Sequence, residues 1–280
     1  MTVATLKDVL GSAIAGNYAV AGFVVLGWED AKAFVDAAEV AGLPVILQAG
    51  PGCRKHTPVE ILGKMFRHLA EQATIPVVCH IDHARTVAEC QIGIESGFTS
   101  VMIDGSMLAL DANIELVSKV VEMSRPHGIS VEGEVGIVGY ADGHASLATS
   151  PEEAAAFERE TGVDALAIAI GNTHLQTEKI AEIDFAALRA IEKVTRVPLV
   201  LHGGSGIPVA MRRTLAQQSR VKKFNIGTEV RMAFGKALRQ VIVDQPAQFD
   251  RIALLSATSP DVQLVAGEII CALGPTKSVG

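Results

Sequence analysis

Residues 75–84 read IPVVCHIDHA, a short apolar run that passes directly into His80, Asp82 and His83. A run of Val and Ile that follows a proline is typical of a parallel strand buried on both faces. Comparable runs recur along the whole chain, at AVAGFVVL (19–26), LPVILQA (43–49), FTSVMID (98–104), ISVEGEV (129–135), DALAIAI (164–170), VPLVLHG (197–203) and VKKFNIG (221–227). The chain therefore contains eight candidate strands.

Segments of helical periodicity separate most of these runs, for example residues 58–74 and 184–195. One strand–helix unit takes roughly 30 residues, and eight units fit a chain of 280 residues. We therefore predict an α/β protein with one domain over residues 1–280, folded as a (β/α)8 or TIM barrel. The alternative, a doubly wound sheet, typically has fewer strands and an early GxGxxG turn, which this sequence lacks.

The composition excludes several classes of protein. With 49% hydrophobic residues the chain is not disordered, and its net charge of −7 without basic blocks argues against nucleic-acid binding. No apolar stretch is long enough to span a membrane, and the N-terminus resembles an amphipathic helix rather than a signal peptide. The four cysteines have no CxxC spacing and suggest reduced thiols. We expect a cytoplasmic protein.

Three histidines follow predicted strands, at positions 83, 174 and 202. Active sites of this barrel lie at the carboxyl ends of the strands, so these side chains are expected to converge. Three imidazoles with an open fourth position suit a catalytic Zn²⁺. Asp104 and Glu134 follow neighbouring strands and are expected either to support the histidines or to bind a second metal. Ordinary polarity at the rim explains these two carboxylates equally well.

The last two predicted strands end in small residues, at HGGSG (202–206) and NIGT (225–228). Loops at these two positions form the phosphate site of many barrels, because their backbone N–H groups are accessible. A lone GGSG indicates only a tight turn, but the pair predicts a phosphate site. A longer loop, GIVGYADGHASLATSP (136–151), has the composition of a lid.

With these residues in view, the chain resembles the class II, zinc-dependent ketose-bisphosphate aldolases, which include fructose-bisphosphate and tagatose-bisphosphate aldolases. The resemblance runs from about residue 5 to the C-terminal helix. It is carried by HIDHA (80–84), VMIDGS (101–106), VEGEVG (131–136), IGNTH (170–174), LHGGSGI (201–207) and FNIGTEVR (224–231).

The resemblance implies that His83, His174 and His202 bind one Zn²⁺ per subunit, which stabilises an enediolate derived from dihydroxyacetone phosphate. It implies that Asp82 moves the proton of the C4 hydroxyl during reversible aldol cleavage. The phosphate and enediolate would be held by Gly203, Ser205, Asn225, Gly227 and Thr228. The resemblance further implies a phosphorylated sugar as substrate, and a homodimer or homotetramer.

Departures from the family pattern predict a substrate other than fructose 1,6-bisphosphate. Leu175 replaces a glycine that normally approaches the phosphate or a monovalent cation, and Ala141 replaces the loop glutamate that exchanges a proton. Asp142 is our candidate for that loop acid, with Tyr140 and His144 as alternatives. Candidates for a second phosphate are Arg54, Lys55, Arg212 and Arg231.

Two other functions stay open on the sequence alone. One is a metal-dependent isomerase, epimerase or decarboxylase that uses the same enediolate without releasing an aldehyde. The other is a non-catalytic protein that binds a sugar phosphate.

Overall fold

All eight predicted strands are present in the computed structural model, which describes residues 2–141, 143 and 146–276. They are β2 (Val20–Val24), β3 (Val45–Ala49), β4 (Val77–Ala84), β5 (Ser100–Ile103), β6 (Ser130–Val135), β7 (Ala165–Ile168), β8 (Leu199–Leu201) and β9 (Val221–Ile226). Every neighbouring pair is parallel, β2 pairs with β9, and the pairing of β4 with β5 closes the ring. The TIM-barrel prediction is confirmed, and the doubly wound alternative is wrong because the eight strands form a closed ring.

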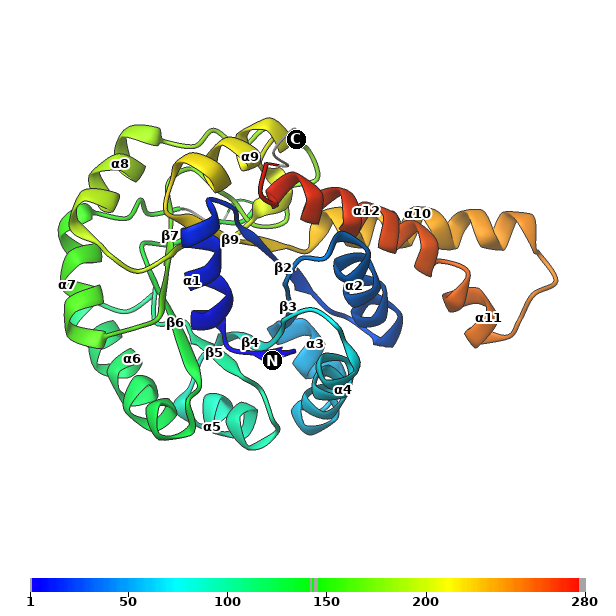
Figure 1. Ribbon diagram of the computed structural model, residues 1–280, viewed down its shortest axis with the longest axis horizontal. Helices are drawn as coiled ribbons and strands as arrows, with labels where there is room; N and C mark the ends of the chain where they lie inside the picture. The colour runs from blue at the N-terminus through cyan, green and yellow to red at the C-terminus, as the bar shows by residue number, and fades with distance from the viewer. Residues whose placement is uncertain (1, 142, 144–145, 277–280) are drawn as a thin grey trace.

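Helices cover the outside of the barrel (Figure 1). In chain order they are α2 (Trp28–Ala41), α4 (Val59–Gln72), α5 (Val87–Glu95), α6 (Leu110–Ser124), α7 (Pro151–Thr161), α8 (Phe185–Val194), α9 (Val209–Gln218) and α10 (Thr228–Asp244). The outward side chains of the strands pack under these helices in one large apolar core. At Gly133 on β6 a Cβ atom would lie 2.7 Å from the ring of Phe157, so the missing side chain lets α7 approach the sheet.

The amino-terminal end of the barrel is closed by α1 (Leu6–Gly16). Thr5 and Asp8 form a reciprocal capping box at its start. Its buried side chains Leu6, Val9, Leu10 and Ala13 join interior residues of the strands, among them Ile46, Val78 and Val200, in a second apolar cluster. The amphipathic helix was therefore predicted correctly. The two-residue strand β1 (Val3–Ala4), which pairs with β4, was not predicted.

The C-terminal helices form an arm that projects from the barrel (Figure 1). It consists of the end of α10, the short helix α11 (Arg251–Ser256) and α12 (Ser259–Leu273), which returns to pack on α2 and α10. Val243, Phe249 and Ile252 on this arm are strongly exposed.

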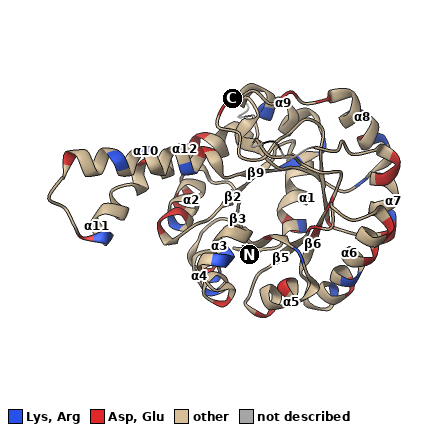
Figure 2. Cartoon of the chain, turned by 180° about the vertical axis from the view of Figure 1, so that it is seen from behind, with Lys and Arg blue, Asp and Glu red and all other residues tan. Residues whose placement is uncertain are grey.

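Charged residues of both signs are interspersed along the outer helices (Figure 2). No helix among the described residues is long and apolar enough to cross a membrane.

Candidate active site

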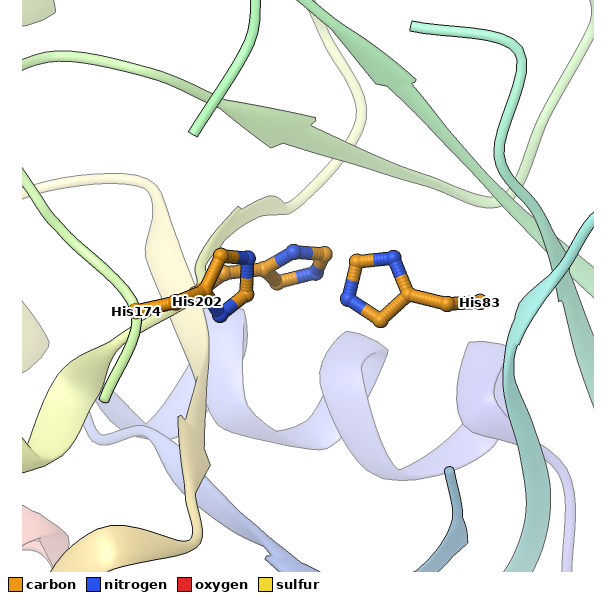
Figure 3. A group of neighbouring side chains, drawn as sticks. All are labelled: His83, His174 and His202. Atoms are coloured by element: carbon orange, nitrogen blue, oxygen red, sulfur yellow. The ribbon is translucent and has the colours of Figure 1, made fainter. Parts of the chain in front are cut away.

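His83, His174 and His202 converge at the carboxyl end of the barrel (Figure 3). His83 lies near the end of β4, His174 in the loop after β7, and His202 directly after β8. The centre of the His83 ring lies 5.4 Å from that of His174 and 4.6 Å from that of His202. One ring nitrogen from each of the three lies within 4.8 Å of the other two. The structure thus brings together the three side chains that the sequence singled out.

A distortion of β4 positions His83. The register between β4 and β5 shifts between Ile81 and Ala84, and His83 has a φ of +51°. Its Nδ1 lies 2.8 Å from Oδ2 of Asp104, whose other oxygen accepts a hydrogen bond from the Ser106 hydroxyl. Because Asp104 occupies Nδ1, it leaves Nε2 of His83 for the centre of the site. Asp104 therefore orients a member of the histidine cluster.

Two glutamates surround His202, which is fully buried. Oε1 of Glu132 lies 3.1 Å from Nε2 of this ring, and Oε2 of Glu134 lies 3.3 Å from Nδ1. Burial by itself lowers the pKa of His202, but Glu134 and Glu132 outweigh it and raise the pKa to about 10. The two carboxylates therefore favour a positive charge at this imidazole, which either a proton or a bound cation supplies.

Beneath His202 lies a buried ion pair that the sequence analysis missed. Nζ of Lys223 is 2.7 Å from Oε2 of Glu132, and neither side chain is exposed. Burial opposes ionisation of Glu132, but Lys223 outweighs it and lowers the pKa of the carboxyl. Lys223 lies toward the amino-terminal end of β9, away from the carboxyl rim. Its long side chain nevertheless reaches the carboxylate that contacts His202, and a charge inside an apolar strand was the available signal.

His174 is held by the loop that the sequence marked as a lid. Its backbone N–H donates to Gly139 O at 2.8 Å, and its carbonyl accepts from the Ala141 N–H at 3.0 Å. The Tyr140 ring stacks on the imidazole with centroids 4.7 Å apart. Burial, and then the neighbouring His202 and His83, lower the pKa of His174 to about 3, so it is a neutral imidazole at neutral pH. Asp142 and His144 lie outside the described residues.

The donor atoms fit a divalent metal. Among the described residues, Nδ1 of His202 and Oε2 of Glu134 are buried without a well-formed hydrogen bond, so both atoms are available to a metal ion. Three imidazoles form the first possible ligand set, and His83 with Asp104 and Glu134 forms a second. Nitrogen and carboxylate ligands of this kind suit Zn²⁺. Asp104 and Glu134 therefore lie close enough to the histidine cluster either to support it or to bind a second metal.

Asp82 is buried and contributes to the wall of a cavity of about 290 Å³ above the histidines. Its Oδ1 accepts a hydrogen bond from Nδ2 of Asn225 at 3.1 Å. Burial opposes ionisation, but His83 and then Lys223 outweigh it and lower the pKa of Asp82. An ionised carboxylate that faces a cavity can accept a proton from a bound ligand.

The predicted phosphate residues line the same cavity: Gly203, Ser205, Asn225, Gly227 and Thr228. Gly203 has a φ of +64°, and a Cβ there would lie 2.1 Å from Thr173 O, so only glycine fits this close approach of two loops. Helix α10 begins at Thr228 and has no side-chain cap. Open N–H groups and the helix dipole make this end suitable for an anion.

The basic residues proposed to bind a second phosphate differ in whether they line the cavity. Arg231 lines the cavity, and Arg85, which the sequence analysis did not consider, lines it too. Arg212 is buried in an ion pair with Glu229, with 3.0 Å between Nη1 and Oε2. Neither Arg54 nor Lys55 belongs to the cavity lining. Of the four arginine and lysine candidates for a second phosphate, only Arg231 therefore lies where a ligand would contact it.

Leu175 is in an unusual backbone conformation. Its φ is +59°, and apart from His83 only Asn17 shares a positive φ among the described non-glycine residues. The side chain is 46% exposed and lines the cavity. A leucine in the left-handed region is strained by about 1–3 kcal/mol. The structure thus places a strained apolar residue directly after His174.

Comparisons with known proteins agree with this geometry. Residues 4–277 match the family described as "Fructose-bisphosphate aldolase class-II". A fructose-bisphosphate aldolase of Geobacillus stearothermophilus is 35% identical over 89% of each chain, and one of Helicobacter pylori is 31% identical over 98% of each. The crystal structure of the YdjI aldolase from Escherichia coli K12 superposes with a TM-score of 0.84 at 32% identity, covering 99% of this chain and 100% of that one.

Removal of the buried ammonium group of Lys223 should destabilise the protein strongly. Lys223→Met removes the ammonium group that pairs with Oε2 of the buried Glu132, and we expect a loss of about 3–5 kcal/mol in the free energy of unfolding. The matched control is Lys222→Met on the same strand, because the one acceptor of Lys222 Nζ among the described residues is the neutral carbonyl of Ala216. A loss of about 1–3 kcal/mol is expected for the control. Urea unfolding measures both, and equal losses would contradict the assignment.

Leu175→Gly should raise the thermal stability. Relief of about 1–3 kcal/mol of strain exceeds the entropic cost of glycine, which is about 0.5–1 kcal/mol. Leu264→Gly on α12 is the control, because this leucine is 63% exposed in ordinary helical backbone. The control should lose about 1 kcal/mol. If both variants lower the melting temperature alike, Leu175 is not strained.

Proposed function

The chain belongs to the class-II fructose-bisphosphate aldolase family of zinc-dependent carbon–carbon lyases, and from this premise we propose how its site works and on what it acts. The proposed reaction is reversible cleavage of a phosphorylated ketose into dihydroxyacetone phosphate and an aldehyde. The observation that carries the proposal is one cavity in which Asp82 and both glycine-rich loops lie above the histidine cluster.

Three imidazoles, from His83, His174 and His202, would hold the zinc ion. When bound, zinc supplies a Lewis acid that stabilises negative charge developing on the carbonyl-bearing fragment of the substrate. Asp104 orients His83 through Nδ1, and Glu132 orients His202 through Nε2. Asp104 and Glu134, together with His83, offer a second position for a metal at the same site.

Asp82 is the proposed general base. Its carboxylate accepts the proton of the C4 hydroxyl, the C3–C4 bond breaks, and its electron pair stays with the carbonyl-bearing fragment while the aldehyde leaves. The hydrogen bond from Asn225 holds one carboxylate oxygen and leaves the other for the substrate. A second acid must return a proton to C3. We propose Asp142 for that step, since Ala141 cannot supply one.

The loops after β8 and β9 are proposed to bind the phosphate. Gly203, Gly227 and Thr228 offer backbone N–H groups, and Ser205 adds a hydroxyl. That hydroxyl accepts a hydrogen bond from the Glu229 N–H at 3.1 Å, so its proton is available to a phosphate oxygen. The positive end of α10 strengthens the attraction.

The substrate is proposed to differ from fructose 1,6-bisphosphate at its distal end. Val24, Leu26 and Leu175 give this cavity an apolar wall, and Arg231 adds a cationic group beside it. A phosphorylated ketose or sugar acid with fewer hydroxyl groups near this wall would avoid leaving polar groups unpaired.

We also propose that the protein is a homodimer or homotetramer. The exposed Val243, Phe249 and Ile252 on the projecting arm support association, because strongly exposed apolar side chains favour burial against another surface. Light scattering on the purified protein tests this, and a monomer at micromolar concentration would contradict it.

A cleavage assay tests the proposed chemistry. The protein is offered a panel of ketose phosphates and sugar-acid phosphates, and the released aldehyde is measured before and after complete removal of metal by a chelator. We expect activity that disappears with the metal and returns with Zn²⁺. Asp82→Asn should lower kcat by about 10²–10⁴-fold while metal and substrate analogues still bind.

Asp36→Asn is the matched control, because this half-buried carboxylate on α2 pairs, within the described part of the chain, only with Lys32 on the same helix. Its kcat should be unchanged. Full cleavage activity without metal would contradict the proposal. Exchange of substrate hydrogen with solvent deuterium, with no aldehyde released from any substrate, would instead indicate an isomerase or epimerase.

A further inference from the structure

The segment that carries Asp82 and His83 does not have the backbone hydrogen bonding of an ordinary strand. Ile81 of β4 pairs with Val101 of β5, and Ala84 pairs with Ile103. Two residues of β4, Asp82 and His83, therefore lie opposite the single residue Met102 of β5. On the other side, the pairing of β4 with β3 ends at Ile81. The carbonyls of Asp82 and His83 therefore need donors from outside the sheet.

Those donors come from one side chain, that of Arg54. This residue lies on the short helix α3 (Pro51–His56), which follows β3, and its side chain is only 9% exposed. Nη1 donates to the carbonyls of Ala49 and Asp82, and Nη2 donates to the carbonyl of His83 at 3.1 Å. The guanidinium thus ties the end of β3 to two consecutive carbonyls of the distorted segment.

A neighbouring carboxylate holds the guanidinium in turn. Oε2 of Glu89 lies 3.4 Å from Nη2 of Arg54 and also accepts the backbone N–H of Arg85 at 2.9 Å. Glu89 thereby fixes the chain on the far side of His83 as well. Residues 82–85 are consequently held by one arginine and one glutamate that both lie outside the cavity lining.

We propose that Arg54 is a positioning residue for the reaction, which keeps the carboxylate of Asp82 and the imidazole of His83 in mutual register. The inference rests on the roles given to these two residues in the proposed function. Arg54 does not reach the substrate, because it does not line the cavity. It acts through the backbone of two residues, one for proton transfer and one for the metal.

The shape of the guanidinium explains why arginine suits this place. Its planar fork presents several N–H groups in fixed directions, so one group can serve three carbonyls at once. The ammonium group of a lysine is a compact point donor and cannot span the same acceptors. The positive φ of His83 adds strain to the segment, and such a conformation persists only where its surroundings hold it.

The test compares Arg54→Lys and Arg54→Met with the wild-type protein. Metal-free protein is titrated with Co²⁺, whose visible absorption reports the geometry of its ligands, and steady-state kinetics are then measured with saturating Zn²⁺. For Arg54→Met we expect metal affinity to fall about 10–100-fold, with an altered Co²⁺ spectrum. We expect kcat to fall about 100-fold, with KM within about twofold of wild type, because the phosphate loops are untouched.

Arg54→Lys should lie between wild type and Arg54→Met in both properties. It retains the charge and serves as the conservative variant if Arg54→Met does not fold. Ile269→Ala on α12 is the control for general loss of stability, since this buried side chain belongs to a helix that packs on α2 and α10. The control should lower the melting temperature and leave the spectrum, the metal affinity and kcat unchanged.

Two outcomes separate the inference from its premise. A wild-type protein that binds no Co²⁺ contradicts the proposed function and the inference with it. A wild-type protein that binds Co²⁺, beside Arg54 variants with the same affinity, spectrum and kcat, contradicts the inference alone. The inference is also overturned if the Ile269→Ala control loses metal affinity in proportion to its loss of stability. The effect would then follow general stability rather than the position of Asp82 and His83.

Discussion

The closed ring of parallel strands is the constraint on which the rest of this structure depends. Because all eight strands run the same way and β4 pairs with β5, every carboxyl end lies on one rim. His83 lies on β4 and His202 directly after β8, far apart in the sequence. Closure of the barrel brings the centres of their imidazole rings to 4.6 Å from each other. No local interaction could do this, and the donor set exists only when the ring is complete.

The interior of the ring is divided along its axis. Toward the amino-terminal end, α1 and strand residues such as Ile46 and Val200 fill it with apolar side chains. Toward the rim it contains Glu132, Lys223 and His80, all fully or almost fully buried. Buried charges are costly unless they are paired, and here Lys223 pairs with Glu132. His80 lies beside this ion pair, and its Nδ1 forms a 2.8 Å hydrogen bond with the Ser100 hydroxyl.

The elements that the sequence predicted well are those with a strong local signal. Short, largely apolar runs bounded by turn residues predicted all eight barrel strands, including β6 and β9, which also contain charged residues. The short strand β1 was missed because two residues carry no periodicity. Histidines at the ends of strands were found by the same logic, since the strand ends were already known.

Other features of the site have no local signal. A positive φ at Leu175 or His83 cannot be foreseen, because these residue types normally avoid that conformation. Arg54 appeared to be a phosphate candidate, as any arginine near a strand end would. Its actual acceptors are the carbonyls of Ala49, Asp82 and His83, and the last two need donors because β4 is distorted there.

The sequence by itself thus determined the strands, the barrel and the residue types available at its rim. Apolar content and hydrophobic periodicity are properties of short segments, so they can be recognised without the rest of the fold. Tertiary structure alone decided which nitrogen of His83 and of His202 faces the centre, through Asp104 and Glu132 respectively. It also decided that Lys223 reaches that glutamate from another strand. These pairings join residues far apart in the chain, and their geometry is set by closure of the ring, which no stretch of sequence encodes alone.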